Sequence, residues 1–126
     1  MERVEQNGQT ERAEPTGRTN RILIVARMTP EKAQEVAALF EASDRTSLPV
    51  ALGVTRRELF HYQRDLYFHL VEFEGDAARA MAEARVREDF QRLCADLDPL
   101  IAPYDPETWR SPADAMATSF YRWSRD

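Results

Sequence analysis

Two histidines, two arginines and an acid fall within one apolar stretch of the sequence, residues 47–73. They are His61, His69, Arg56, Arg57 and Glu58. An imidazole can accept or return a proton near neutral pH, and a guanidinium can hold an oxygen on which negative charge develops. Polar groups this close together in strand-like sequence indicate either a site or an interface. The elements that carry them decide which of these groups meet.

The stretch is predicted to form two strands joined by a polar turn near Gln63 and Arg64. Along the second strand two sets of side chains alternate, Leu66, Phe68 and Leu70 on one face and Tyr67, His69, Val71 and Phe73 on the other. The first set is wholly apolar, so we expect it to pack against helices. We expect the second set to face a cavity or a partner.

The length of the turn decides which residues of the first strand accompany His69. An even number of turn residues brings Arg56 and Glu58 beside it, whereas an odd, bulged turn brings Arg57 and His61. No glycine marks the turn and fixes its type. The sequence therefore leaves both registers open.

The sequence before this pair predicts a tail, a strand and a helix. Residues 1–20 have no apolar periodicity and are expected to be flexible. A β-branched apolar run from Arg21 indicates a strand that is covered on both faces. The residues Thr29-Pro30-Glu31 are typical of a helix start, and we expect the helix to end near residues 43–44.

The sequence after the pair predicts helical structure and a last strand. Apolar residues recur at helical spacing over residues 77–84 and 86–97. Residues 100–112 contain three prolines and should run irregularly over the surface, with Trp109 as an anchor. The aromatic residues near the C-terminal end predict a strand within residues 115–124.

The order strand, helix, strand, strand, helix, strand predicts an α+β fold, the ferredoxin-like split βαβ unit, over residues 21–126. In this fold one face of an antiparallel sheet carries the helices. The other face would be too apolar to remain in water, so we expect a homodimer that packs sheet against sheet as a dimeric α/β-barrel. The cavity is then expected between the two sheets.

Composition limits the classes of function. The chain has 126 residues, a formal charge of -5 and a sequence pI near 5.1, which disfavours nucleic acid as a partner. No signal-like or membrane-spanning apolar run is present, so we expect a cytoplasmic protein without membrane contact. Cys94 is interpreted as a buried thiol, and the two histidines match no standard spacing for a metal site.

Four segments together resemble a known family. They read TSLPVALGVTRRELF, DLYFHLVE, RILIVARM and SFYRWS. The sequence over residues 20–124 resembles the small aromatic polyketide cyclases of the tetracenomycin type. This resemblance implies a dimeric ferredoxin-like barrel that binds a linear or partly cyclised polyketide, free or bound to a carrier protein. It also implies aldol-type ring closure without metal or cofactor.

The resemblance implies roles for residues by position. Arg57 and His69 match cavity groups of the family, and Asp44 matches the acid of a His-Asp pair whose histidine is replaced here by Ser43. We therefore expect His69, Arg57 and Asp44 to be catalytic. Substrate-binding residues are expected at four positions: Tyr67, Phe60, Trp123 and Ser43.

Other interpretations remain open at this stage. A histidine on a strand is often a hydrogen-bonded structural residue, and Asp44 can simply end its helix. Arg56 and Arg57 can serve in ion pairs across strands or between chains. The alternatives to a cyclase are a cofactor-free monooxygenase acting on a polycyclic aromatic, and a non-catalytic subunit that binds and shields a polyketide.

Overall fold

The computed structural model describes residues 20–110 and 112–125. The flexible tail expected over residues 1–20 lies outside this part of the chain except for Asn20. Among the described residues, no helix is both long enough and apolar enough to cross a membrane.

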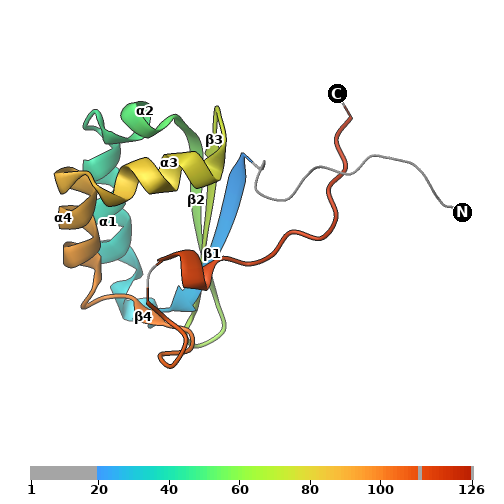
Figure 1. Ribbon diagram of the computed structural model, residues 1–126. Coiled ribbons are helices and arrows are strands. Elements are labelled where there is room, and N and C mark those ends of the chain that lie inside the picture. The colour runs from blue at the N-terminus through green and yellow to red at the C-terminus, as the bar shows by residue number, and fades with distance from the viewer. Residues whose placement is uncertain (1–19, 111, 126) are drawn as a thin grey trace, which may run out of the picture.

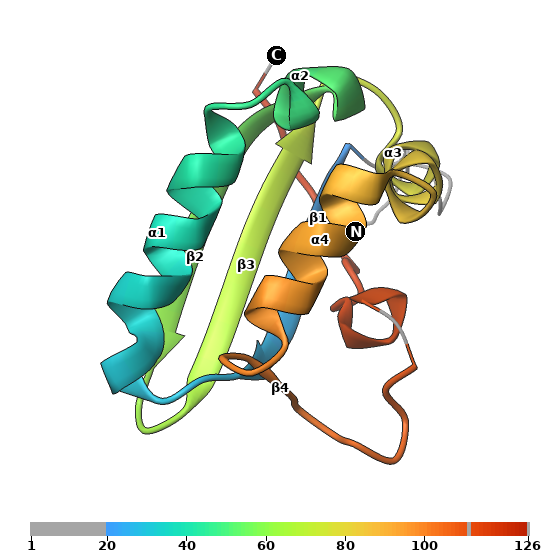
Figure 2. The same cartoon turned by 90° about the vertical axis from the view of Figure 1, so that its left-hand side faces the viewer.

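Four antiparallel strands form one sheet in the order β2-β3-β1-β4, and the helices cover one of its faces (Figures 1 and 2). The strands are β1 (Arg21–Arg27), β2 (Val54–Tyr62), β3 (Leu66–Phe73) and β4 (Ala102–Pro103). The helices are α1 (Ala33–Asp44), α2 (Leu48–Leu52), α3 (Ala77–Arg85) and α4 (Glu88–Leu97). This is the predicted ferredoxin-like α+β fold.

Helix α1 ends at Asp44, as the sequence predicts, but the short helix α2 occupies residues that were expected to form a strand. Pro49 lies in the first turn of α2, where its missing N–H breaks no helical hydrogen bond. Gly53 ends the helix with φ 77°, a left-handed conformation that glycine adopts without a steric penalty. Strand β2 therefore begins only at Val54.

The β2–β3 hairpin settles the open register. Tyr62 pairs with Leu66, so the loop holds three residues, 63–65, and Gln63 adopts a positive φ of 60°. This odd loop is the alternative that brings Arg57 and His61 to the same face as His69. A bulge at Thr55 shifts the pairing once more, so that Val54 shares this face with Arg57.

The two faces of β3 are the reverse of the prediction. Tyr67, His69, Val71 and Phe73 are buried beneath the helices, whereas Leu66, Phe68 and Leu70 are only partly buried on the opposite face. The prediction was wrong because it took the purely apolar set as the helix-facing one. The set that faces the helices is instead the mixed one, Tyr67, His69, Val71 and Phe73, whose members both pack in the core and line a cavity.

The predicted last strand is also wrong. The fourth strand is the two-residue β4, which lies in the segment expected to be irregular. Met116 makes a single bridge to Ile24, and the N–H of Ala117 donates to the carbonyl of Leu23 at 2.8 Å. Beyond this point the chain leaves the body on the side of the sheet opposite the helices (Figure 1). High aromatic content did not indicate a strand here.

Buried side chains form two clusters on the helix-facing side of the sheet. One contains Val36 and Phe40 of α1 with Tyr67, and the other contains Phe73 with Ala77 of α3. Along β3, His69 lies between the residues of the two clusters. The core is thus divided at the position of the one buried histidine.

Candidate active site

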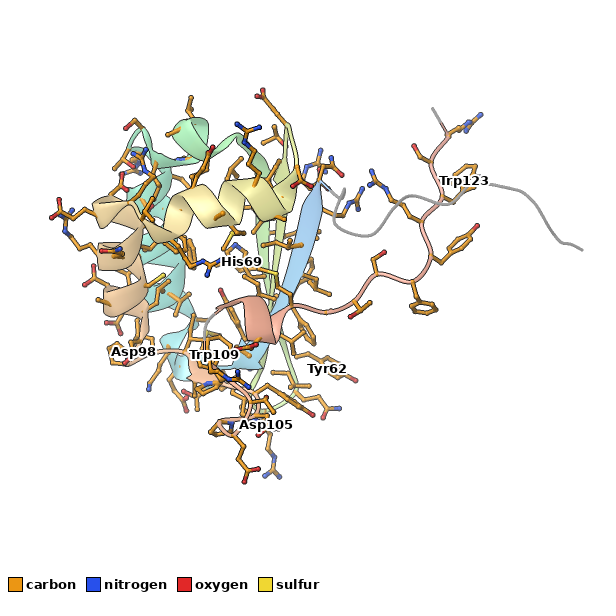
Figure 3. The ribbon with its side chains drawn as sticks, in the orientation of Figure 1. Tyr62, His69, Asp98, Asp105, Trp109 and Trp123 are labelled. Atoms are coloured by element: carbon orange, nitrogen blue, oxygen red, sulfur yellow. The ribbon has the colours of Figure 1, made fainter. Side chains whose placement is uncertain are left out.

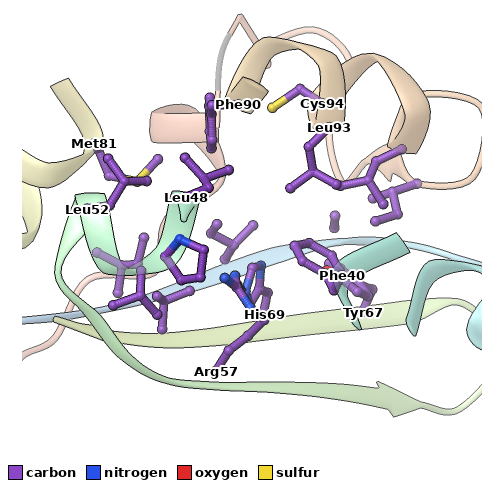
Figure 4. A pocket seen from close by; sticks show the side chains of 18 of the residues that line it. Phe40, Leu48, Leu52, Arg57, Tyr67, His69, Met81, Phe90, Leu93 and Cys94 are labelled. Atoms are coloured by element: carbon purple, nitrogen blue, oxygen red, sulfur yellow. Dashed lines mark hydrogen bonds between the residues drawn. The ribbon is translucent and has the colours of Figure 1, made fainter. Parts of the chain in front are cut away.

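A cavity of about 280 Å³ lies between the sheet and the helices. Its walls are mostly apolar and come from β1, β2, β3 and all four helices, as Figure 4 shows for part of them. The prediction that His69 faces a cavity is confirmed. The cavity, however, forms within one chain, on the helix side of the sheet, and not between two sheets as expected.

Arg57 projects from β2 into this cavity and is held by Asp44 at the end of α1. Its Nε donates to Oδ2 at 3.0 Å and its Nη2 donates to Oδ1 at 2.8 Å. Such a two-bond pairing fixes the plane of the guanidinium as well as its position. A carboxylate at a helix C-terminus is unfavourable by itself, so the arginine charge also compensates Asp44.

Two rings, those of Phe40 and His69, lie against the guanidinium. Arg57 lies over the ring of Phe40, with 4.9 Å from Cζ to the ring centroid. The ring of Phe40 in turn meets His69 edge-on at 4.9 Å. Arg57 has only 16% of its side chain exposed, so this cation is largely withdrawn from water. The surrounding rings and Asp44 leave it a single orientation toward the cavity.

His69 is 6% exposed and contacts Arg57 directly, with 3.0 Å between His69 Nε2 and Arg57 Nη1. Burial, and secondarily the positive charge of Arg57, lower the pKa of His69 to about 3. This pKa disfavours uptake of a proton by His69 near neutral pH, so we expect a neutral imidazole there, and the catalytic role of His69 stays a prediction.

Tyr67 is 3% exposed and lines the same cavity, as predicted for a substrate-binding residue. Burial raises the pKa of its phenol, and the nearby Arg57 charge only partly opposes this. Tyr67 therefore stays protonated. Its ring centroid lies 6.4 Å from that of His69.

Three other predicted binding residues lie away from the cavity. Phe60 is 43% exposed on the opposite face of the sheet, and Trp123 is 69% exposed on the C-terminal segment, far from His69 in Figure 3. Ser43 is outside the cavity lining, and its carbonyl accepts hydrogen bonds from Thr46. Phe60 and Trp123 were assigned on the expectation of a cavity between two sheets, and Ser43 on its position beside Asp44, so their binding roles stay predictions. His61, at the exposed end of β2, lies outside the lining too.

Several lining residues were not assigned to a site from the sequence. Met81 of α3 and Phe90, Leu93 and Cys94 of α4 face the cavity, and so does Trp109. Their helical spacing indicates a buried face but does not distinguish packed core from cavity wall. Burial raises the pKa of the Cys94 thiol, so it stays protonated. Within residues 20–110 and 112–125, no group of three or more His, Cys, Asp or Glu side chains is arranged to hold a metal ion.

Sequence comparison places most of this chain in one family. The profile of the polyketide synthesis cyclase family matches residues 20–124. Protein SCO5314 of Streptomyces coelicolor is 44% identical over 82% of this chain and 93% of its own length. Polyketide synthase CurG of Streptomyces cyaneus is 41% identical over 82% of this chain and 96% of its own. Tetracenomycin F2 cyclase of Streptomyces glaucescens is 38% identical over 82% of this chain and 94% of its own length.

Comparison with solved structures agrees with the fold. The structure of tetracenomycin F2 cyclase, described as a type II polyketide cyclase, matches with a TM-score of 0.76 over 84% of this chain and 98% of that one. A Chloroflexus aurantiacus protein described as an antibiotic biosynthesis monooxygenase matches with a TM-score of 0.50 over 68% and 84%. At 17% identity, the second match shows a shared fold alone.

Proposed function

Because this chain belongs to the polyketide synthesis cyclase family, we propose that it directs aldol-type ring closure and dehydration of a poly-β-ketone from a type II polyketide synthase. The observation that supports this most is the chain of hydrogen bonds from Asp44 through Arg57 to His69, set in an apolar cavity. This arrangement presents a fixed cation to an uncharged substrate whose carbon chain carries many carbonyl oxygens.

Ring closure joins two carbons of one polyketide chain. A methylene between two carbonyls loses a proton to become an enolate, and its carbon attacks a distant carbonyl carbon. The oxygen of that carbonyl takes the negative charge and then a proton, and the new alcohol leaves as water together with a neighbouring hydrogen. Arg57 can donate to an oxygen that carries negative charge in the first two steps. In this proposal a base from solvent, hydroxide or a buffer anion, takes the first proton, and Arg57 holds the enolate oxygen that results; the low pKa of His69 makes it a weak proton acceptor near neutral pH.

The apolar walls have a second role in the proposal. A flexible poly-β-ketone can react between many pairs of carbons, so the product depends on which pair is held close together. The walls from α1, α2 and α4 limit how the chain can fold, and Arg57 fixes one oxygen. Position of ring closure is then decided by the shape of the cavity and by one anchored atom.

We further propose that the protein is a homodimer, as the exposed side of the sheet favours. Phe60 and Tyr62 of β2 are 43% and 57% exposed there. On the C-terminal segment Phe120, Tyr121 and Trp123 are 95%, 77% and 69% exposed. Large apolar side chains gathered on one side of a molecule are typical of a covered interface.

Reconstitution with a minimal polyketide synthase tests the function. We expect the purified protein to raise the yield of one cyclised product and to lower the yield of shunt products in which other pairs of carbons have joined. Arg57→Met should remove most of that effect, whereas Arg56→Met, whose side chain is 70% exposed, should retain it. Identical product patterns with and without the protein would refute a cyclase.

The same experiment separates the two alternatives. A monooxygenase on this fold would consume oxygen when given a polycyclic aromatic and would leave the pattern from a linear polyketide unchanged. A non-catalytic binding subunit would keep the normal product ratio in Arg57→Met and lose it only when a bulky residue, as in Leu93→Trp, fills the cavity.

A further inference from the structure

The contact between Arg57 and His69 fixes which nitrogen of the imidazole carries its proton. A guanidinium has only donors, so at 3.0 Å its Nη1–H must donate and His69 Nε2 must accept. A neutral imidazole has one N–H, and that hydrogen is therefore on Nδ1. The buried ring presents a donor, and not a basic nitrogen, on the side away from Arg57.

This Nδ1–H has no hydrogen-bond partner among the described residues, although His69 is only 6% exposed and lines the cavity. The hydroxyl of Tyr67, 3% exposed and in the same lining, also lacks a partner within the described chain. Buried donors are usually satisfied, and leaving one unpaired costs free energy. Two such groups in one apolar cavity indicate that a ligand supplies the acceptors.

We propose that His69 acts as a hydrogen-bond donor through Nδ1–H to a carbonyl or enolate oxygen of the ligand, with Arg57 setting its tautomer. The inference rests on the proposed function for the identity of that ligand. In it, Arg57 has two roles, since it offers its remaining N–H groups to the substrate and holds His69 in the donating form. Asp44 positions Arg57 for both.

The charged and titratable neighbours are consistent with a donor that does not change with pH. Arg57 on β2 faces the ring from one side, and Tyr67 is its neighbour on β3. Cys94 and Asp98 of α4, together with Arg110, line the same cavity. Within the described chain no carboxylate is hydrogen-bonded to His69, so no anion there favours the imidazolium.

Nuclear magnetic resonance of protein labelled with ¹⁵N-histidine tests the tautomer directly. The chain has two histidines, and His61→Gln, a change outside the cavity, assigns the signals. We expect His69 to show a protonated Nδ1 and an unprotonated Nε2 from about pH 5 to pH 8. A protonated Nε2, or titration of His69 near neutral pH, would overturn the proposal.

Two matched variants test the use of that donor in the reaction. The amide of asparagine in His69→Asn can reach the place of Nδ1, whereas glutamine in His69→Gln reaches toward Nε2. We expect His69→Gln to lower the rate of correct cyclisation about ten- to a hundredfold, and His69→Asn to stay within about tenfold of wild type. Equal loss in both, with folding confirmed by circular dichroism, would contradict a role for Nδ1–H.

These results distinguish the inference from the proposed function. If the wild-type protein leaves the product pattern of a polyketide synthase unchanged, the cyclase proposal fails, and the tautomer measured by resonance still decides the state of His69. If the wild-type protein cyclises but His69 carries its proton on Nε2, the cyclase proposal survives and this inference fails.

Discussion

The two faces of strand β3 differ in what covers them. Tyr67, His69 and Val71 lie beneath helices, are 3–6% exposed and share their space with a cavity. Leu66 and Phe68, the neighbours of Tyr67 along the strand, face the other side, and among the described residues helices α1–α4 all lie on the first side (Figure 1). Because side chains alternate along the eight-residue strand, one face of β3 lines the cavity and the other face stays open.

The comparison teaches that the cavity and the proposed dimer interface are on opposite sides of the same sheet. Dimerisation was expected to create the cavity, whereas this cavity is lined by the sheet and the helices of one chain. Changes on one face should therefore leave the other unaffected.

The largest effect is expected on the covered face. Arg57→Met removes the cation that Asp44 and His69 hold, and it should lower the rate of correct cyclisation about 10²- to 10³-fold, as loss of an oxyanion donor does. Arg56→Met, the adjacent change on the open face, should have less than about a threefold effect on the rate. Comparable losses in the two variants would show that the faces are not independent.

A charge on the open face should act on assembly alone. Phe60→Glu places a carboxylate in the proposed interface and should raise the dissociation constant of the dimer about a hundredfold, measured by sedimentation. Tyr67→Phe, on the covered face, should leave sedimentation unchanged. A monomeric wild type would contradict the dimer, and loss of cyclisation in a well-folded Phe60→Glu monomer would show that the partner completes the cavity.

Acid should destabilise the covered face through His69. Its folded pKa of about 3 lies below the ordinary value of 6.5, so the unfolded chain binds more protons between these limits and stability falls as pH falls through that window. Between pH 7 and pH 5 the contribution of His69 to the free energy of unfolding should decrease by about 2 kcal/mol. Urea denaturation of wild type and His69→Asn at both pH values measures this difference, and parallel losses in the two proteins would contradict it.

The smallest effect is expected where a residue acts through another. Asp44→Asn keeps an acceptor for Arg57 but removes the charge, so the rate of cyclisation should fall about tenfold. The free energy of unfolding should change by less than about 1 kcal/mol, because Asp44 is 38% exposed. Glu41→Gln, which breaks a surface pair with Arg45 on the same helix, serves as control. A larger loss of stability than of rate would make Asp44 a structural residue.

The sequence predicts the order of the first three strands, the end of α1 at Asp44 and the cavity-facing position of His69. Local signals suffice for these because proline, alternation and helical spacing act over a few residues. The turn length at Gln63 and the bulge at Thr55 could not be predicted from local sequence, since no glycine marks either position. The meeting of Arg57 with His69 depends on the turn length, whereas the bulge decides only that Val54 shares their face.

The positions of the aromatic residues outside this cavity have a different cause. Phe60 and Trp123 were assigned to binding because aromatic residues suit both a cavity wall and an interface, and residue type does not distinguish the two. Phe90 and Cys94 were taken as core for the same reason. Whether an apolar side chain meets protein or empty space depends on the distance between sheet and helices, which no local pattern encodes.

The bulge at Thr55 has a consequence for how such a site can diversify. Pairing from Arg56 to Tyr62 is set at the hairpin end of β2, whereas Val54 and helix α2 continue from the other side of the extra residue. The bulge therefore separates two parts of the cavity wall, the paired strands that carry Arg57 and His69 and the short helix α2. A change of length in α2 is expected to alter the shape of the cavity there while the pairing of β2 with β3 from Arg56 to Tyr62 is kept.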